Sequence, residues 1–127
     1  MRVCIDLDGV ICQLRKENQT YEELSPVKGA VEKIKKLKDE GHYIIIYTAR
    51  NMKTQNANVG KVVKNIGLVT LEWLDRHSIF YDEIYFGKPW ADIYIDDNAF
   101  RFEKWETIDD DGKNLPLSSE KRIRGDE

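Results

Sequence analysis

Four short apolar runs are spaced along the chain, and each is followed at once by polar residues. Continuous apolar runs of this length are typical of parallel strands that are covered on both faces. We therefore expect four strands, at Arg2–Asp6, His42–Tyr47, Glu83–Phe86 and Ile93–Ile95.

Two amphipathic segments separate the first three of these runs. Ser25 and Pro26 supply an N-cap and a first-turn residue for a helix that should end before Gly41. A second helix is expected over Gly60–His77, and Gly67 is a point where it could break. The order β, α, β, α, β, β predicts an α/β fold with a doubly wound parallel sheet.

The length of 127 residues corresponds to one domain, which we place at residues 1–117, followed by a polar tail at 118–127 that should fray. No apolar run approaches the roughly 20 residues that a bilayer needs, so no membrane partner is expected. The first residues are too polar for a signal peptide. Cys4 and Cys12 cannot form a disulfide framework and suit free thiols, so we expect a cytoplasmic protein.

Charge argues against a nucleic-acid partner. The chain has 20 basic and 23 acidic residues, a net charge of −3, and its lysines are interspersed with acids. A nucleic-acid-binding domain usually shows a basic face instead.

Polar clusters follow all four expected strands. Because ligands of open α/β sheets bind outside the carboxyl ends of the strands, these clusters should converge on one crevice. The clusters are Asp6-Leu7-Asp8-Gly9, Thr48-Ala49-Arg50, Gly87-Lys88-Pro89 and Asp96-Asp97-Asn98.

The residue types in these clusters favour phosphate chemistry. Crowded carboxylates repel one another and need a cation, and oxygen ligands without a nearby His or Cys cluster select Mg²⁺. Thr48 and Lys88 can bind phosphate oxygens. A carboxylate in this setting can act as a nucleophile and form an aspartyl-phosphate.

The set DLDGV, IIIYTAR, GKP and IYIDD resembles the four motifs of the haloacid dehalogenase superfamily of phosphohydrolases, in order. The stretches TARNMKTQNANVGK and EWLDRHSIFYDEIYFGKPW look more narrowly like a small bacterial family of capsule-biosynthesis phosphatases. The resemblance covers roughly residues 1–105. It implies a Mg²⁺-dependent phosphatase with a Rossmann-like core, acting on a small phosphorylated substrate. One departure is Val10, where the superfamily often has Thr.

Carried over by position, the resemblance implies a role for each motif residue. Asp6 would attack phosphorus, and Asp8 would protonate the leaving oxygen and then activate water. Thr48 and Lys88 would bind the phosphoryl oxygens. The metal would be held by Asp6, the Asp8 carbonyl, and Asp96 or Asp97.

No interval between motifs is long enough for a separate cap domain, so the crevice should be open. The loop at 50–61 is rich in amide side chains, which suit sugar hydroxyls. We expect Arg50, Asn51 and Lys61 to contact substrate and hypothesise a phosphorylated sugar or sugar acid, as in surface-polysaccharide biosynthesis. An ordinary mobile loop and closure by a second subunit of a homo-oligomer are alternatives that the sequence leaves open.

Three other functions compete with this reading. A signalling receiver domain has similar size and residue types, but its acidic pair follows the first strand, whereas here it comes last. A non-catalytic phosphate-binding module should have lost Asp6 or Asp8, and both are present. A phosphatase of nucleotides or nucleic-acid ends is the third alternative.

Overall fold

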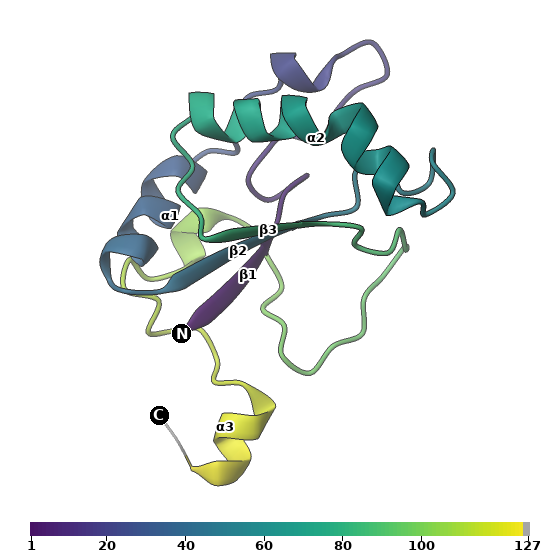
Figure 1. Cartoon of the computed structure of the whole chain (residues 1–127). Coiled ribbons are helices and arrows are strands. Elements are labelled where there is room, and N and C mark those ends of the chain that lie inside the picture. The colour runs from purple at the N-terminus through teal and green to yellow at the C-terminus, as the bar shows by residue number, and fades with distance from the viewer. Residues whose placement is uncertain (126–127) are drawn as a thin grey trace.

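The structure is a computed structural model in which residues 1–125 are described. Three parallel strands form the sheet in the order β1-β2-β3, and helices connect them (Figure 1). The strands are β1 (Arg2–Asp6), β2 (Tyr43–Thr48) and β3 (Glu83–Phe86), the α-helices are α1 (Ala30–Asp39), α2 (Val59–Arg76) and α3 (Ser119–Arg124), and two 3₁₀ turns are η1 (Tyr21–Glu23) and η2 (Trp105–Thr107).

The first three expected strands are confirmed, and the fourth is wrong. Residues 93–95 have no strand partner, and Ile95 is 98% exposed. A strand exists only where a ladder pairs it, and within residues 1–125 the sheet stops at β1, whose outer edge carries no paired strand. Three apolar residues in a row therefore did not suffice to identify a strand.

The start of α1 also differs from the expectation. The segment around Pro26 pairs with the residues after β1 instead of entering a helix, because the Gln13 amide donates to the Ser25 carbonyl and the Val27 amide donates to the Ile11 carbonyl. Gly29, with a φ of 87°, then turns the chain into the helix. The Ser-Pro start was a local signal that a long-range contact overrides.

The ends of both long helices follow ordinary capping rules. Gly41, at a φ of 92°, terminates α1 as expected. The Asn58 side chain caps α2 by accepting from the Lys61 amide, 3.0 Å away. Helix α2 runs through Gly67 without a break, since one glycine costs a helix only about 1 kcal/mol.

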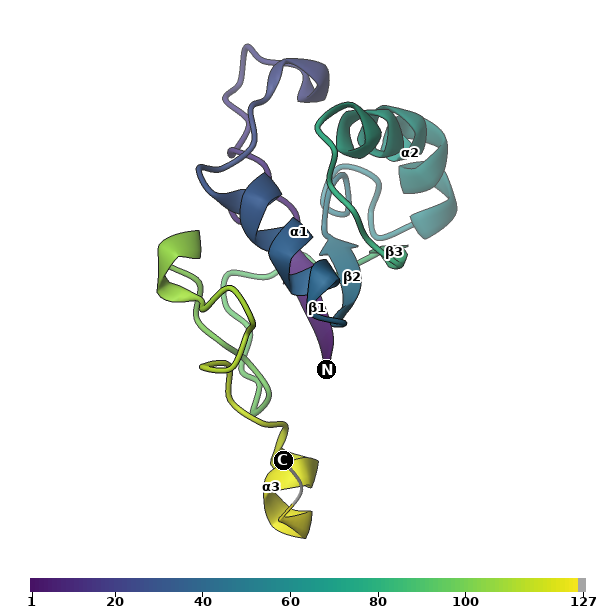
Figure 2. The same cartoon turned by 90° about the vertical axis from the view of Figure 1, so that its left-hand side faces the viewer.

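The C-terminal tail contains a short helix where it is described. Residues 119–124 form α3, capped by the Ser118 side chain, which accepts from the Lys121 amide. Figure 2 shows α3 apart from the sheet and the other helices. The last two positions of the expected tail, 126 and 127, lie outside the described residues.

One face of the sheet carries the core. In β2, Ile44 and Ile46 are fully buried and join a cluster with side chains of both α1 and α2. The alternate residues of the strand point to the opposite face and are only half-buried. The protein is therefore a small α/β domain with a parallel three-stranded sheet, while a doubly wound sheet with helices on both faces stays a prediction. None of the helices in the described part of the chain is long and apolar enough to cross a membrane.

The region after residue 100 completes the core. The indole of Trp105 is buried, and its Nε1 donates to the Val10 carbonyl at 2.8 Å. Trp105 also packs on Gly29, where an added Cβ would lie 3.1 Å from the Trp105 Cβ. Ile108 belongs to the same cluster. Residues that precede β2 and residues that follow position 100 thus pack into one core.

Candidate active site

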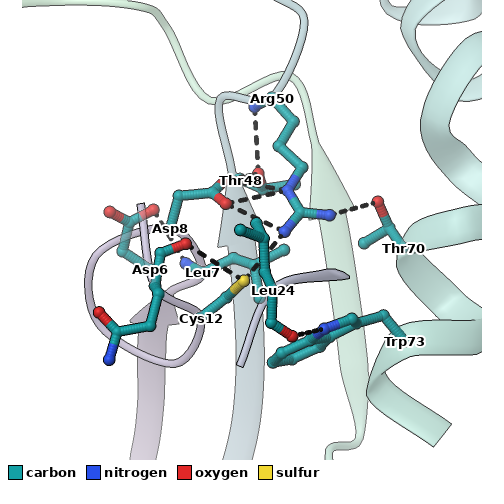
Figure 3. Close-up of polar contacts among 10 residues, drawn as sticks. Asp6, Leu7, Asp8, Cys12, Leu24, Thr48, Arg50, Thr70 and Trp73 are labelled. Carbon is teal, nitrogen blue, oxygen red and sulfur yellow. Dashed lines mark hydrogen bonds and ion pairs between the residues drawn. The ribbon is translucent and has the colours of Figure 1, made fainter. Parts of the chain in front are cut away.

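A tight turn after β1 positions the first two acidic residues. The amides of Ile11 and Cys12 both donate to the Leu7 carbonyl, and Gly9 adopts a φ of 88° that favours glycine. The chain therefore folds back on itself within six residues. This bend leaves the carboxylates of Asp6 and Asp8 beside the carboxyl end of β2 (Figure 3).

Asp8 is held by a buried arginine. The Arg50 Nε lies 3.0 and 3.1 Å from the two Asp8 carboxylate oxygens, and Nη2 lies 3.0 Å from Oδ1. The side chain of Arg50 is only 1% exposed, against 25% for that of Asp8. A bidentate pair of this kind fixes the orientation of the carboxylate plane.

The remaining donors of Arg50 are used inside the protein. Its Nη1 donates to the Thr70 hydroxyl at 3.0 Å, and its Nη2 contacts the Cys12 sulfur at 3.4 Å. The guanidinium also stacks over the Tyr21 ring, 4.1 Å from the centroid. In this arrangement Arg50 faces Asp8 and the interior, which does not match the expected contact with substrate. Its geometry suits a residue that positions Asp8.

Thr48 lies at the end of β2 and is fully buried. Its hydroxyl makes a long hydrogen bond of 3.4 Å to the Asp8 carboxylate and accepts from the Arg50 amide at 3.1 Å. The structure therefore brings Thr48, Asp8 and Arg50 together, as their positions at the strand ends predicted. To bind a phosphate oxygen, the hydroxyl must turn away from Asp8.

Lys88 approaches the same site from β3. Its amide donates to the Thr48 carbonyl at 3.1 Å, and its Nζ lies 3.6 Å from the Asp6 carboxylate. The ammonium also sits over the ring of Tyr94, 4.2 Å from the centroid. Gly87, at a φ of 97°, makes the turn that directs Lys88. A cation thus lies beside the carboxylate expected to act as nucleophile.

The environment of Asp6 disfavours its charge. Burial raises the pKa of this carboxyl, opposed by the positive charge of Lys88 and reinforced by the negative charge of Asp8. The Asp6 carboxylate is therefore partly desolvated, and the charge of Lys88 offsets only part of that cost. The burial of Cys12 likewise raises the pKa of its thiol to about 11.

The other two expected carboxylates lie elsewhere. Asp96 and Asp97 are exposed and belong to the segment that hydrogen-bonds to α3. Asp96 accepts from the Asn98 amide at 2.7 Å, and the Asp97 carbonyl accepts weakly from Ser119. Because the expected fourth strand is absent, nothing carries these carboxylates to the end of β1.

The described residues therefore do not bring together a complete set of carboxylates for a magnesium ion. Residues 1–125 contain no group of three or more His, Cys, Asp or Glu side chains that could hold a metal. Asp6 pairs with Lys88 and Asp8 pairs with Arg50, so both carboxylates already have cationic partners at the place where a metal would need free oxygens. A metal would need a third carboxylate to approach.

The two remaining predicted contacts lie at the rim. Asn51 accepts from the Asn65 side chain and adopts a φ of 61°. Lys61 is exposed in the first turn of α2. Sequence reasoning missed Thr70, which lies on the apolar side of α2 and gave no polar signal, and Tyr94, whose ring covers Lys88.

Comparison with known proteins supports the fold but does not identify the chemistry of the site. No protein-family model and no curated protein matches the chain. The crystal structure of an MCSG target from Vibrio cholerae is similar, with a TM-score of 0.73 and 32% sequence identity, covering 97% of this chain and 94% of the other. The chain is therefore an α/β domain of the same family.

Proposed function

We propose that the protein is a phosphatase that hydrolyses phosphate monoesters through an aspartyl-phosphate on Asp6, as in the haloacid dehalogenase superfamily. The observation that carries the proposal is the meeting of Asp6, Asp8, Thr48 and Lys88 at the ends of three parallel strands. Strand ends are where α/β folds place ligands, and this set supplies a nucleophile, a proton carrier and phosphate-binding groups.

The reaction proceeds in two displacements. An Asp6 carboxylate oxygen attacks phosphorus, and the ester P–O bond breaks while Asp8 gives a proton to the leaving oxygen. In the second step Asp8 takes a proton from water, whose oxygen attacks phosphorus and displaces Asp6. Lys88 leaves Asp6 for the phosphoryl group, and this charge neutralisation lowers the repulsion between two anions. Acid–base transfer by Asp8 contributes on the order of 10² to 10⁴ in rate.

Mg²⁺ belongs to the proposal as a cofactor that binds with the substrate. When bound, it would neutralise the phosphoryl group. To hold the ion, Asp96 or Asp97 would have to lie closer to Asp6 than in this structure. Activity that persists in excess EDTA would exclude this part of the proposal, and Asp96→Asn and Asp97→Asn would show which carboxylate matters.

The substrate proposed here is a small phosphorylated sugar, handled in the cytoplasm. The net charge of −3 and the interspersion of lysines with acids along the chain argue against nucleic-acid ends. Phosphate release should be measured with sugar phosphates, nucleotides, a 3′-phosphorylated oligonucleotide and acetyl phosphate.

Two variants test the mechanism. Asp6→Asn should abolish turnover, because the amide is close in shape to the carboxylate but is a poor nucleophile. Asp75→Asn is the matched control, since Asp75 is exposed on α2. Turnover of the Asp6 variant within tenfold of the unaltered protein would refute the covalent mechanism.

A further inference from the structure

A hollow of about 470 Å³ lies beside the proposed active site. Two segments form it, one following β2 and one following β3. The lining is aliphatic or aromatic apart from one amide and one ammonium group. The residues that line it are Met52, Lys53, Asn56, Ala57, Pro89 and Trp90.

Both segments that line the hollow begin within two residues of a side chain of the proposed active site. Trp90 is two residues from Lys88, so its Cα is at most about 7.6 Å from that of Lys88. Met52 is two residues from Arg50, which bonds to Asp8. A substrate whose phosphate lies between Asp6 and Lys88 therefore has this hollow as the neighbouring place for the rest of the molecule.

Trp90 presents an exposed ring there, with an ammonium group over it. It is 57% exposed, and the Lys53 ammonium lies 4.7 Å from the centroid of its ring. Lys53 is the only charged residue in the lining. A ligand that stacks on the indole therefore meets a cation as well.

The loop that carries Lys53 is held in a costly conformation. Asn51, Asn56 and Ala57 have φ values of 61°, 51° and 61°, in a region that favours glycine. Each such residue costs on the order of 1 kcal/mol or more. Backbone bonds maintain the shape, including one of 2.8 Å from the Ala57 amide to the Met52 carbonyl. The loop therefore forms one side of the hollow with a backbone conformation that hydrogen bonds maintain.

Resting on the proposed function, we infer that this hollow binds the sugar ring of a phosphorylated sugar acid, with the apolar ring face on Trp90 and the carboxylate on Lys53. A pyranose offers an apolar C–H face to the indole, and its hydroxyls suit the Asn56 amide. Its carboxylate gives Lys53 a counter-charge when the ring displaces the ammonium from the indole. A neutral nucleobase would displace the Lys53 ammonium from the indole without providing a counter-charge.

Steady-state kinetics with three substrates test this assignment. Trp90→Ala should raise KM about tenfold for both glucuronic acid 1-phosphate and glucose 1-phosphate, and leave that for acetyl phosphate, which has no ring, within about twofold. Lys53→Met should raise KM about two- to fivefold for the acidic sugar alone. Phe80→Ala is the matched control, because Phe80 is 50% exposed and distant in sequence from both segments. Equal changes for all three substrates would overturn the assignment.

Fluorescence separates this inference from the proposed function. Trp90 is the exposed tryptophan, whereas Trp73 and Trp105 are 0% and 2% exposed, so acrylamide quenching reports mainly on Trp90. In the Asp6→Asn variant, glucuronic acid 1-phosphate should protect Trp90 from quenching. Protection without any turnover in the unaltered protein would support the hollow and refute the phosphatase.

The opposite results count against the hollow. Turnover without protection would refute the sugar-acid site and leave the phosphatase standing. Stronger protection by a nucleoside monophosphate would overturn the sugar acid in favour of a nucleobase.

Discussion

Replacing Arg50 with methionine should lower the free energy of unfolding by about 3 to 5 kcal/mol, the range for breaking a buried ion pair from one side. The side chain of Arg50 is 1% exposed, so the change leaves Asp8 without its charged partner. Water reaches Asp8, which is 25% exposed, and this hydration offsets part of the cost of leaving its charge without a partner. Thr70, fully buried, loses the donor that reaches its hydroxyl, which costs about 1 to 3 kcal/mol by itself. The two effects together keep the expected value within the range above.

Urea unfolding followed by circular dichroism measures this change, with the midpoint and slope fitted together. Lys64→Met is the control, because Lys64 is exposed on α2 and the same type of replacement there should stay within about 0.5 kcal/mol. A loss below about 1 kcal/mol for Arg50→Met would refute the reasoning that the pair is buried and coupled.

If the Arg50 variant is too unstable to purify, a milder change tests the same network. Thr70→Val removes the hydroxyl and keeps the shape, and should cost about 1 to 3 kcal/mol because one guanidinium donor is left without an acceptor. Combining it with Arg50→Lys in a double-mutant cycle gives the coupling energy, which should exceed about 0.5 kcal/mol for residues in contact.

Three further predictions concern stability and reactivity. Asp6→Asn should raise the melting temperature at pH 7, because burial raises the pKa of Asp6 and folding therefore disfavours its charged form. The cost of this charge appears as the pH rises from below the unfolded pKa through the raised folded pKa, so the advantage of the variant should shrink at pH 4. An advantage that grew at pH 4 would contradict the prediction. A thiol reagent should label Cys4, which is exposed, and spare Cys12, which is buried with a pKa of about 11, until the protein is denatured; labelling of both thiols at once would be the contrary result. Gly87→Ala should cost at least about 1 kcal/mol by chemical denaturation, since a Cβ there would lie 2.9 Å from a Val59 methyl at a φ of 97°; an unchanged midpoint would show that this turn relaxes freely.

Local patterns predicted the elements that local forces determine. The bounds of β1 and β3 coincide with the expected ones, because an apolar run between polar residues leaves little choice of where a strand begins and ends. The start of α1 was missed because Val27 bonds to Ile11, a contact that no local pattern reveals. The segment at 93–95 shows the reverse case, in which an apolar run has no partner.

The site was predicted to the extent that strand topology determines it. Parallel strands bring their carboxyl ends together, and this is why Asp8, Thr48 and Lys88 meet as expected. The direction in which a side chain points depends on partners distant in sequence. Arg50 was expected to face substrate, but Thr70 on α2 and Cys12 after β1 supply buried partners that turn it inward.

The packing of Trp105 against Val10 has a consequence for the order of synthesis. A ribosome delivers all the strands and both long helices before it delivers Trp105, whose indole fills the space between Val10 and Gly29. Trp105 follows Val10 by 95 residues. A nascent chain that has emerged only as far as β3 therefore presents an incomplete apolar face. Cooperative folding must wait for Ile108 to emerge, so a chain that stops short of that residue exposes its core to chaperones and proteases.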